Sequence, residues 1–155
     1  MITQVEQLAQ QYLDGEPAEI SEDTMDEFCE WIMTEYQQLP LAVEASDFMR
    51  YDSAADMFAD IEQDHLWESV ESYDSDMYPS PFYGFALVAI HDYDHYLCQA
   101  DFSLEGEMTA YQAIAQRAPS KKIQQILYSE IVLKSAAHLY LGHRPNSKVV
   151  FPESI

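Results

Sequence analysis

The segment 81–107, PFYGFALVAIHDYDHYLCQADFSLEGE, contains the longest apolar run of the chain and its two most closely spaced histidines. Between Phe82 and Ile90 only Gly84 interrupts the aliphatic and aromatic residues, which predicts a buried helix rather than an amphipathic surface helix. The run is too short to cross a bilayer, which needs about 20 apolar residues. We therefore expect a buried central helix at about 82–100, with no membrane association and with the rest of the chain packed around it.

Helix signals divide the rest of the chain. Small hydroxyl residues, which favour the N-cap position, stand before several stretches with apolar residues at helical spacing. No stretch alternates apolar and polar residues long enough to predict a sheet. At 155 residues the chain 1–155 predicts a single all-α domain, an irregular bundle of five or six helices around the central helix. The expected N-caps are Thr3, Ser21, Ser53, Asp101 or Ser103, and Ser120.

The charge of the chain is very uneven. Residues 1–80 contain 21 acidic side chains and a single base, Arg50, whereas residues 81–155 contain 7 acidic and 6 basic side chains. No basic stripe is present to neutralise phosphates, so we do not expect direct binding to nucleic acid. The acidic half 1–80 has three interpretations: a solvated surface, a docking surface for a basic protein partner, or a mimic of a nucleic-acid phosphate array that inhibits a DNA-binding enzyme.

Two further features concern the environment of the chain. Cys29 and Cys98 fall on apolar helical faces and no secretion signal precedes them, so we expect reduced core thiols in a cytoplasmic protein. The apolar face of the short first helix, over about 3–15, can pack in the core of a monomer or in a homodimer, and both interpretations stay open.

Candidate metal ligands lie on the predicted inward faces of several helices. His91 and His95 are four residues apart, which places their imidazoles about 40° apart on the apolar face of the central helix. Glu107 follows in the first turn of the next predicted helix, where the helix dipole alone would also favour a carboxylate. Imidazole and carboxylate together suit a divalent metal ion such as iron, manganese or zinc, and bundles build such sites between facing helices. The remaining candidates are Glu62, His65, Glu130 and His138.

Three of these remaining candidates also have a simpler interpretation. His65 and His138 can be core histidines with one hydrogen-bond partner. Glu130 lies in the middle of an apolar stripe, where a lone carboxylate is costly, and Lys134 one turn later is an ordinary salt-bridge partner for it.

The candidate set resembles the ligands of the ferritin-like di-iron and di-manganese carboxylate proteins, in which two helices each supply a Glu and two others each supply a Glu-x-x-His element. Glu62-Gln63-Asp64-His65 matches one such element, on a predicted helix that continues from Ser53 to His65. A second element is absent. The resemblance implies a bundle and a class of metal but no substrate, and a single metal held by three histidines with one or two carboxylates fits equally well.

A second, smaller resemblance is to the helical HD-type metal phosphohydrolases. It rests on the doublet His91-Asp92, with His65 as an upstream ligand. That family also uses a distant downstream Asp, and none follows Asp101 in this chain.

Two functional hypotheses from different classes result. The first is a metal-binding helical bundle, with a non-haem iron oxidoreductase as its first candidate activity, in which histidines 65, 91 and 95 hold the metal and a Glu completes the shell. The second is an acidic interaction or DNA-mimic protein without catalysis, whose residues 1–80 bind a basic partner. The phosphate-binding and nucleophile motifs of several common enzyme classes do not occur in the sequence.

Overall fold

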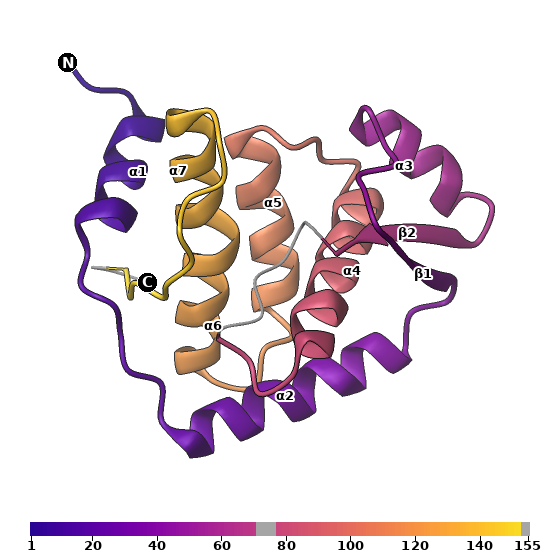
Figure 1. The fold of residues 1–155 in the computed structure, drawn as a ribbon, viewed down its shortest axis with the longest axis horizontal. Helices are drawn as coiled ribbons and strands as arrows, with labels where there is room; N and C mark the ends of the chain where they lie inside the picture. The colour runs from indigo at the N-terminus through magenta and orange to yellow at the C-terminus, as the bar shows by residue number, and fades with distance from the viewer. Residues whose placement is uncertain (71–76, 153–155) are drawn as a thin grey trace.

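The computed structural model describes residues 1–70 and 77–152 and is mainly helical (Figure 1), which confirms the all-α prediction. The last three helical segments follow one another without a break and form one long rod with a π-helical middle. The central helix occupies its predicted place. The elements are α1 (Gln4–Asp14), α2 (Glu22–Gln37), β1 (Ala42–Ser46), α3 (Ala54–Ile61), β2 (His65–Ser69), α4 (Pro81–Cys98), α5 (Leu104–Ala115), α6 (Lys121–Tyr128), the π-helical η1 (Ser129–Leu133) and α7 (Lys134–Leu141).

Hydroxyl N-caps begin the helices as predicted. Each cap oxygen accepts a hydrogen bond from a backbone N–H of the first turn, which would otherwise lack a partner. Of the two alternatives before α5, Ser103 is the cap, while Asp101 accepts hydrogen bonds from the Ser103 amide and hydroxyl. The other predicted caps are Thr3, Ser21, Ser53 and Ser120.

The helices pack around α4 and the long rod (Figure 1). In that view α1 lies beside α7, α5 lies between the rod and α4, and α2 runs along the lower edge. Apolar side chains from α2, α4, α5 and α6 meet in the main core, which includes Phe28, Ile90, Ile114 and Leu127. Among the described helices, none is both long and apolar enough to cross a bilayer.

A partly exposed ion network joins three helices beside this core. Arg117, at the end of α5, binds both carboxylate oxygens of Asp94 on α4, at 3.0 and 2.9 Å, and also binds Glu35 on α2. Asp94 is only 3% exposed. Because such a bidentate pair has one geometry, it fixes α4 relative to α5.

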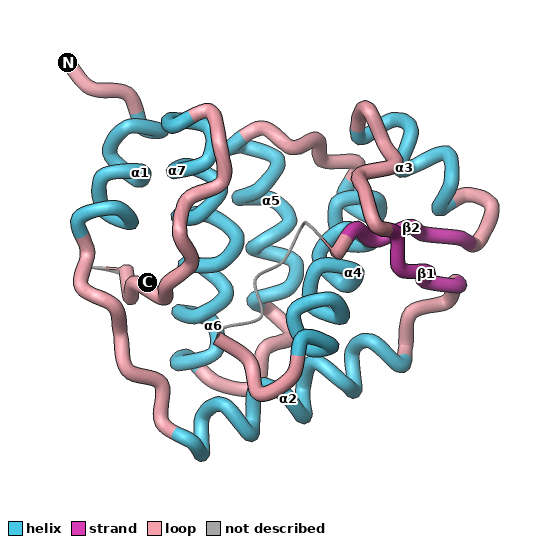
Figure 2. Tube along the Cα trace, viewed as in Figure 1, coloured by secondary structure: helices cyan, strands magenta, loops and turns pink. Residues whose placement is uncertain are grey.

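A two-stranded parallel sheet was not predicted (Figure 2). Strands β1 and β2 pair from Ala42 opposite His65 to Ser46 opposite Ser69, and α3 connects them. Parallel strands need such a crossover connection. Each strand has only five residues, which is too short for its alternation to stand out in the sequence.

The prediction that His65 lies on a helix is wrong, because the helix ends before this residue. Helix α3 ends at Ile61, with Glu62 as its C-cap, and Asp64 adopts a left-handed conformation with φ of 59°. That conformation cannot continue a right-handed helix, so the chain turns into β2. Leu66, not His65, packs against α3 and α4.

Candidate metal centre

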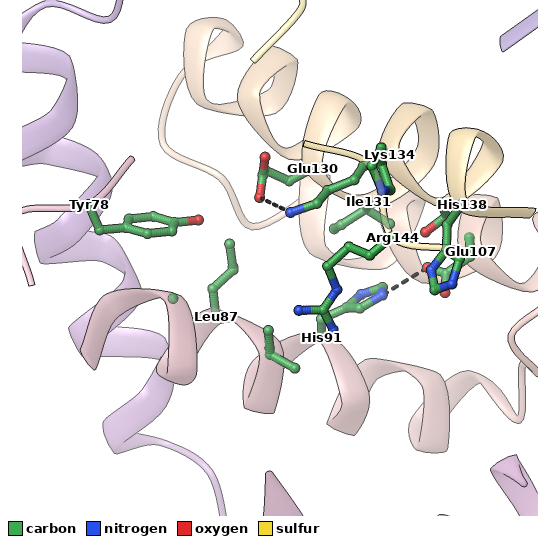
Figure 3. A pocket seen from close by; sticks show the side chains of 13 residues that line it. Tyr78, Leu87, His91, Glu107, Glu130, Ile131, Lys134, His138 and Arg144 are labelled. Atoms are coloured by element: carbon green, nitrogen blue, oxygen red, sulfur yellow. Dashed lines mark hydrogen bonds and ion pairs between the residues drawn. The ribbon is translucent and has the colours of Figure 1, made fainter. Parts of the chain in front are cut away.

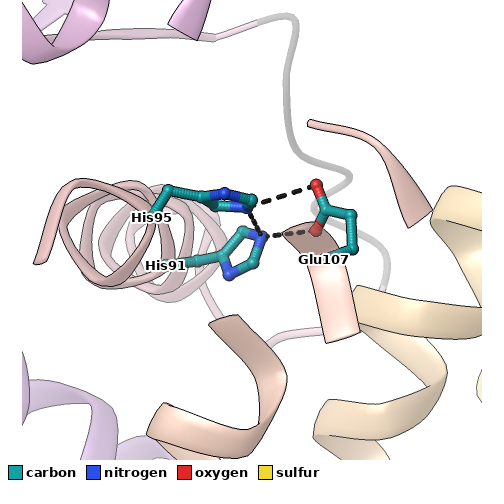
Figure 4. A group of neighbouring side chains, drawn as sticks. All are labelled: His91, His95 and Glu107. Atoms are coloured by element: carbon teal, nitrogen blue, oxygen red, sulfur yellow. Dashed lines mark hydrogen bonds and ion pairs between the residues drawn. The ribbon is translucent and has the colours of Figure 1, made fainter. Parts of the chain in front are cut away.

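His91, His95 and Glu107 converge on one point between α4 and α5 (Figure 4). The Nε2 atom of His91 lies 2.9 Å from Oε2 of Glu107 and 3.1 Å from Nε2 of His95. The Nε2 atom of His95 lies 3.3 Å from the other oxygen, Oε1, of Glu107. His95 is fully buried and Glu107 is 7% exposed. Two imidazole nitrogens and one carboxylate therefore face the same small volume.

The end of α4 fixes the orientation of the His95 ring. Gln99 adopts a left-handed conformation with φ of 53°, which folds the chain back so that the carbonyl oxygen of Ala100 lies 2.9 Å from Nδ1 of His95. A carbonyl oxygen can only accept, so Nδ1 carries the proton and donates it. In the neutral ring Nε2 then carries no proton, and its lone pair is directed at the cluster, as in metal-ligating histidines.

The start of α5 places Glu107 by a close contact between backbones. A Cβ atom at Gly106 would overlap the carbonyl group of Asp101, so only glycine lets the connection from α4 pass this close. Ser103 caps the helix by accepting a hydrogen bond from the Gly106 amide, 3.1 Å away. The loop that ends one ligand-bearing helix therefore also sets the first turn of the other.

The electrostatics of the cluster keep its carboxylate ionised. Burial by itself raises the pKa of Glu107, but the charge and hydrogen bond of His91, together with those of His95, lower it to about 2. Burial lowers the pKa of His91, yet the negative charge and hydrogen bond of Glu107 outweigh it, so that the pKa of His91 is raised. The Nδ1 atom of His91 is buried and has no hydrogen-bond partner within the described part of the chain. Glu107 is thus the main contact that orients this ring.

The spacing of the three ligand atoms fits a transition metal. With bonds of about 2.1 Å, two ligand atoms lie about 3.0 Å apart at a right angle and about 3.4 Å apart at a tetrahedral angle. The two Nε2 atoms, 3.1 Å apart, fall in this range, and Glu107 places one oxygen 2.9 Å from His91 and the other 3.3 Å from His95. Two histidines and a carboxylate on one face are the donor set of non-haem iron sites and of catalytic zinc sites, both of which keep open positions.

The other four predicted ligands do not join this group of atoms. Glu62 is exposed and accepts a hydrogen bond from Tyr96. His65 binds Asp60 through Nδ1 at 2.8 Å and Glu44 through Nε2 at 2.7 Å, and the hydrogen bonds of these carboxylates raise its pKa. The Glu-x-x-His element that carried the ferritin-like resemblance therefore lies outside the cluster.

Glu130 and His138 lie in the wall of a neighbouring cavity instead. This cavity has a volume of about 190 Å³ and is also lined by His91 and Glu107 (Figure 3). Glu130 belongs to the π-helical segment η1, and such segments occur frequently at functional sites. The ion pair expected from the sequence is present but long, with 3.9 Å between Lys134 Nζ and Glu130 Oε2.

Sequence reasoning missed a buried carboxyl group next to the cluster. Glu68 on β2 is 3% exposed, and its side chain hydrogen-bonds that of Asp92, which follows His91 directly. Burial, followed by the charge of Asp92, raises the pKa of Glu68 well above its usual value. Glu68 and Glu107 line a second cavity of about 270 Å³. An alternating pattern over β2 would have been the signal for this buried position, but the strand is too short to show it.

Comparisons of the chain with known protein families, with curated proteins and with solved structures gave no match.

Proposed function

We propose that the protein binds one divalent metal ion through His91, His95 and Glu107 and uses the open side of that ion for catalysis. The observation that carries the proposal is the convergence of two imidazoles and a carboxylate in a largely buried site, with one ligand atom from each residue within 4.8 Å of the others. Glu107 is held ionised, as metal binding requires, and the hydrogen bond from Nδ1 of His95 leaves Nε2 as the atom that would bind the ion in place of a proton.

Iron is the first candidate metal, with an oxidoreductase activity, and manganese and zinc are the alternatives. Three protein ligands on one face leave positions for a substrate or oxygen, which a bound iron would activate. The adjoining cavity supports a catalytic rather than a purely structural metal, because structural zinc sites are closed by four protein ligands. The free thiols Cys29 and Cys98 support a reducing compartment, and we place the protein in the cytoplasm.

Elemental analysis of protein purified without chelators tests this proposal. We expect about one metal ion per chain, lost in His91→Ala and retained in His65→Ala and His143→Ala. The His65 variant is the sharper control, because the sequence alone made this residue a ligand whereas its side chain lies with Asp60 and Glu44. Unchanged metal content in His91→Ala, or no metal after reconstitution with iron, manganese and zinc, would reject the metal centre. Oxygen consumption by the iron-loaded protein then tests the oxidoreductase activity.

A second candidate function is docking of a basic protein partner, in the manner of a DNA mimic or otherwise. It is supported by α2, which runs along one edge of the molecule (Figure 1) and carries a row of exposed acids that form none of the ion pairs of the described residues: Glu22, Asp23, Asp26, Glu27 and Glu30.

Polylysine is a suitable probe of this second function. Binding through charge falls steeply with salt and survives His91→Ala. Replacing Asp26 and Glu27 by Asn and Gln should weaken it. Affinity that is independent of salt would reject the docking surface and leave the metal centre untouched.

A further inference from the structure

The cavity beside the metal centre has the size and composition of a site for a small molecule. Its volume of about 190 Å³ corresponds to roughly six water molecules, well below the range of drug-sized ligand pockets. His91 and Glu107 form one part of its wall, so an occupant would lie against the open side of the proposed metal. Much of the remaining wall is apolar and includes Leu87, Val88 and Ile131.

Two of the seven basic residues of this very acidic chain line the same cavity, Lys134 and Arg144. Lys134 has partners, because its Nζ atom lies 2.6 Å from the Ser147 hydroxyl and 3.9 Å from Glu130. Arg144 is exposed at the mouth of the cavity, and its guanidinium forms no hydrogen bond or ion pair with any residue of 1–70 or 77–152. Figure 3 shows the Arg144 side chain extending from the C-terminal segment toward His91.

The charges in this wall favour a singly charged anion. Lys134 and Glu130 balance each other, and a divalent metal with Glu107 would keep one positive charge, which an anionic ligand on its open side would balance. Arg144 then contributes one unbalanced positive charge, presented as a planar fork of N–H donors that matches a carboxylate.

We propose that this cavity binds a small organic monocarboxylate, with its carboxylate held by Arg144 on the side of His91 and its apolar body lying along Leu87, Val88 and Ile131. This inference rests on the proposed metal centre, since the carboxylate end of the occupant is the end that faces His91 and the metal. The substrate class is therefore a compact monocarboxylic acid with an apolar chain or ring.

Fluorine NMR with 4-fluorobenzoate tests the carboxylate site, with 4-fluorobenzamide as the uncharged probe of the same shape. We expect 4-fluorobenzoate to bind, and the amide to bind at least about tenfold more weakly. Arg144→Gln should lower the affinity for 4-fluorobenzoate by about tenfold or more, because it removes a charge-assisted pair of hydrogen bonds. The affinity of Arg144→Lys for 4-fluorobenzoate should lie between that of the unchanged protein and that of Arg144→Gln. Lys121→Gln removes a charge from an exposed position of α6 and should change the affinity by less than about twofold.

The orientation is tested in the same samples loaded with Mn²⁺, which broadens the signal of a nearby nucleus. We expect stronger broadening for 2-fluorobenzoate, whose fluorine lies beside the carboxylate, than for 4-fluorobenzoate, whose fluorine lies at the opposite end. Equal affinity in Arg144→Gln, or equal binding of the amide, would overturn the inference even where metal content is normal.

Metal content measured on these samples separates this failure from that of the proposed function. Arg144-dependent 4-fluorobenzoate binding by a protein that takes up no metal would uphold the carboxylate site and reject the metal centre. Manganese uptake without 4-fluorobenzoate binding would uphold the metal centre and reject the carboxylate site.

Discussion

Replacing Glu107 by Gln should destabilise the metal-free protein by about 3 kcal/mol at pH 5.5. An unfolded Glu has a pKa of about 4.3, and burial beside His91 and His95 leaves that of Glu107 at about 2. The difference of about 2.3 units corresponds to about 3 kcal/mol, because each unit is worth about 1.4 kcal/mol. Little screening is expected, since the Glu107 side chain is only 9% exposed. Gln keeps the shape and an acceptor oxygen, so the substitution removes mainly the charge.

The pH dependence of this loss identifies its cause. A depressed pKa contributes stability that is fully present above the unfolded value of about 4.3 and is lost as the pH falls toward 2. Because the pKa of His91 is raised, the stability that His91 contributes is fully present below about pH 6.5 and is lost at higher pH. At pH 5.5 the contributions of Glu107 and of His91 are therefore both present. Urea unfolding with chelator present should show the loss shrink to roughly half at pH 3.

The matched control for this substitution is Glu105→Gln, which removes an exposed carboxylate from the same first turn of α5. It should cost less than about 0.5 kcal/mol at both pH values. An equal loss in the control, or a loss in Glu107→Gln that does not change between pH 5.5 and pH 3, would refute the argument that the histidines stabilise a buried charge.

Three further predictions concern metal binding and the ion pairs around the core. Below the raised pKa of His91 the metal must displace a proton, so its affinity, measured by competition with a chelator, should fall about tenfold per pH unit there and stay level above it. His65→Gln should lower the free energy of unfolding by about 1 kcal/mol at pH 6, where the protonated ring pairs with two carboxylates. This loss should vanish as the pH rises through the raised pKa of His65. An equal loss in His143→Gln would contradict the prediction. Arg117→Met should cost about 3 kcal/mol in urea unfolding, because it leaves the carboxylate of Asp94 buried without its partner, and a loss below about 1 kcal/mol would argue against the pair.

The part of the site that could be predicted from the sequence is the part built from neighbouring residues. His91 and His95 are one turn apart, and Glu107 follows only 16 residues after His91. A helix with an apolar face, one reversal and an N-cap place these three groups together, and each of these features has a local signal. The same reasoning failed at His65, because apolar residues at helical spacing continued past the point where Asp64 turns the chain. The helical spacing of apolar residues indicates which positions face the core, but it does not indicate the residue at which the helix ends.

The cavity wall could not be predicted, because it depends on long-range packing. Arg144 and Lys134 reach the metal ligands only after the last helix has packed beside α4 and α5, and the π-helical turn at Glu130 has no local sequence signal. The proposed ligands therefore come from α4 and α5 alone, whereas the cavity wall adds η1, α7 and the segment up to Arg144 to residues of α4. On the proposed function, substitutions between η1 and Arg144 should change which acid binds while leaving the metal in place. Substitutions at Gly106 or His95 cannot do so, because the close backbone contact and the ring orientation at these positions hold the ligands themselves.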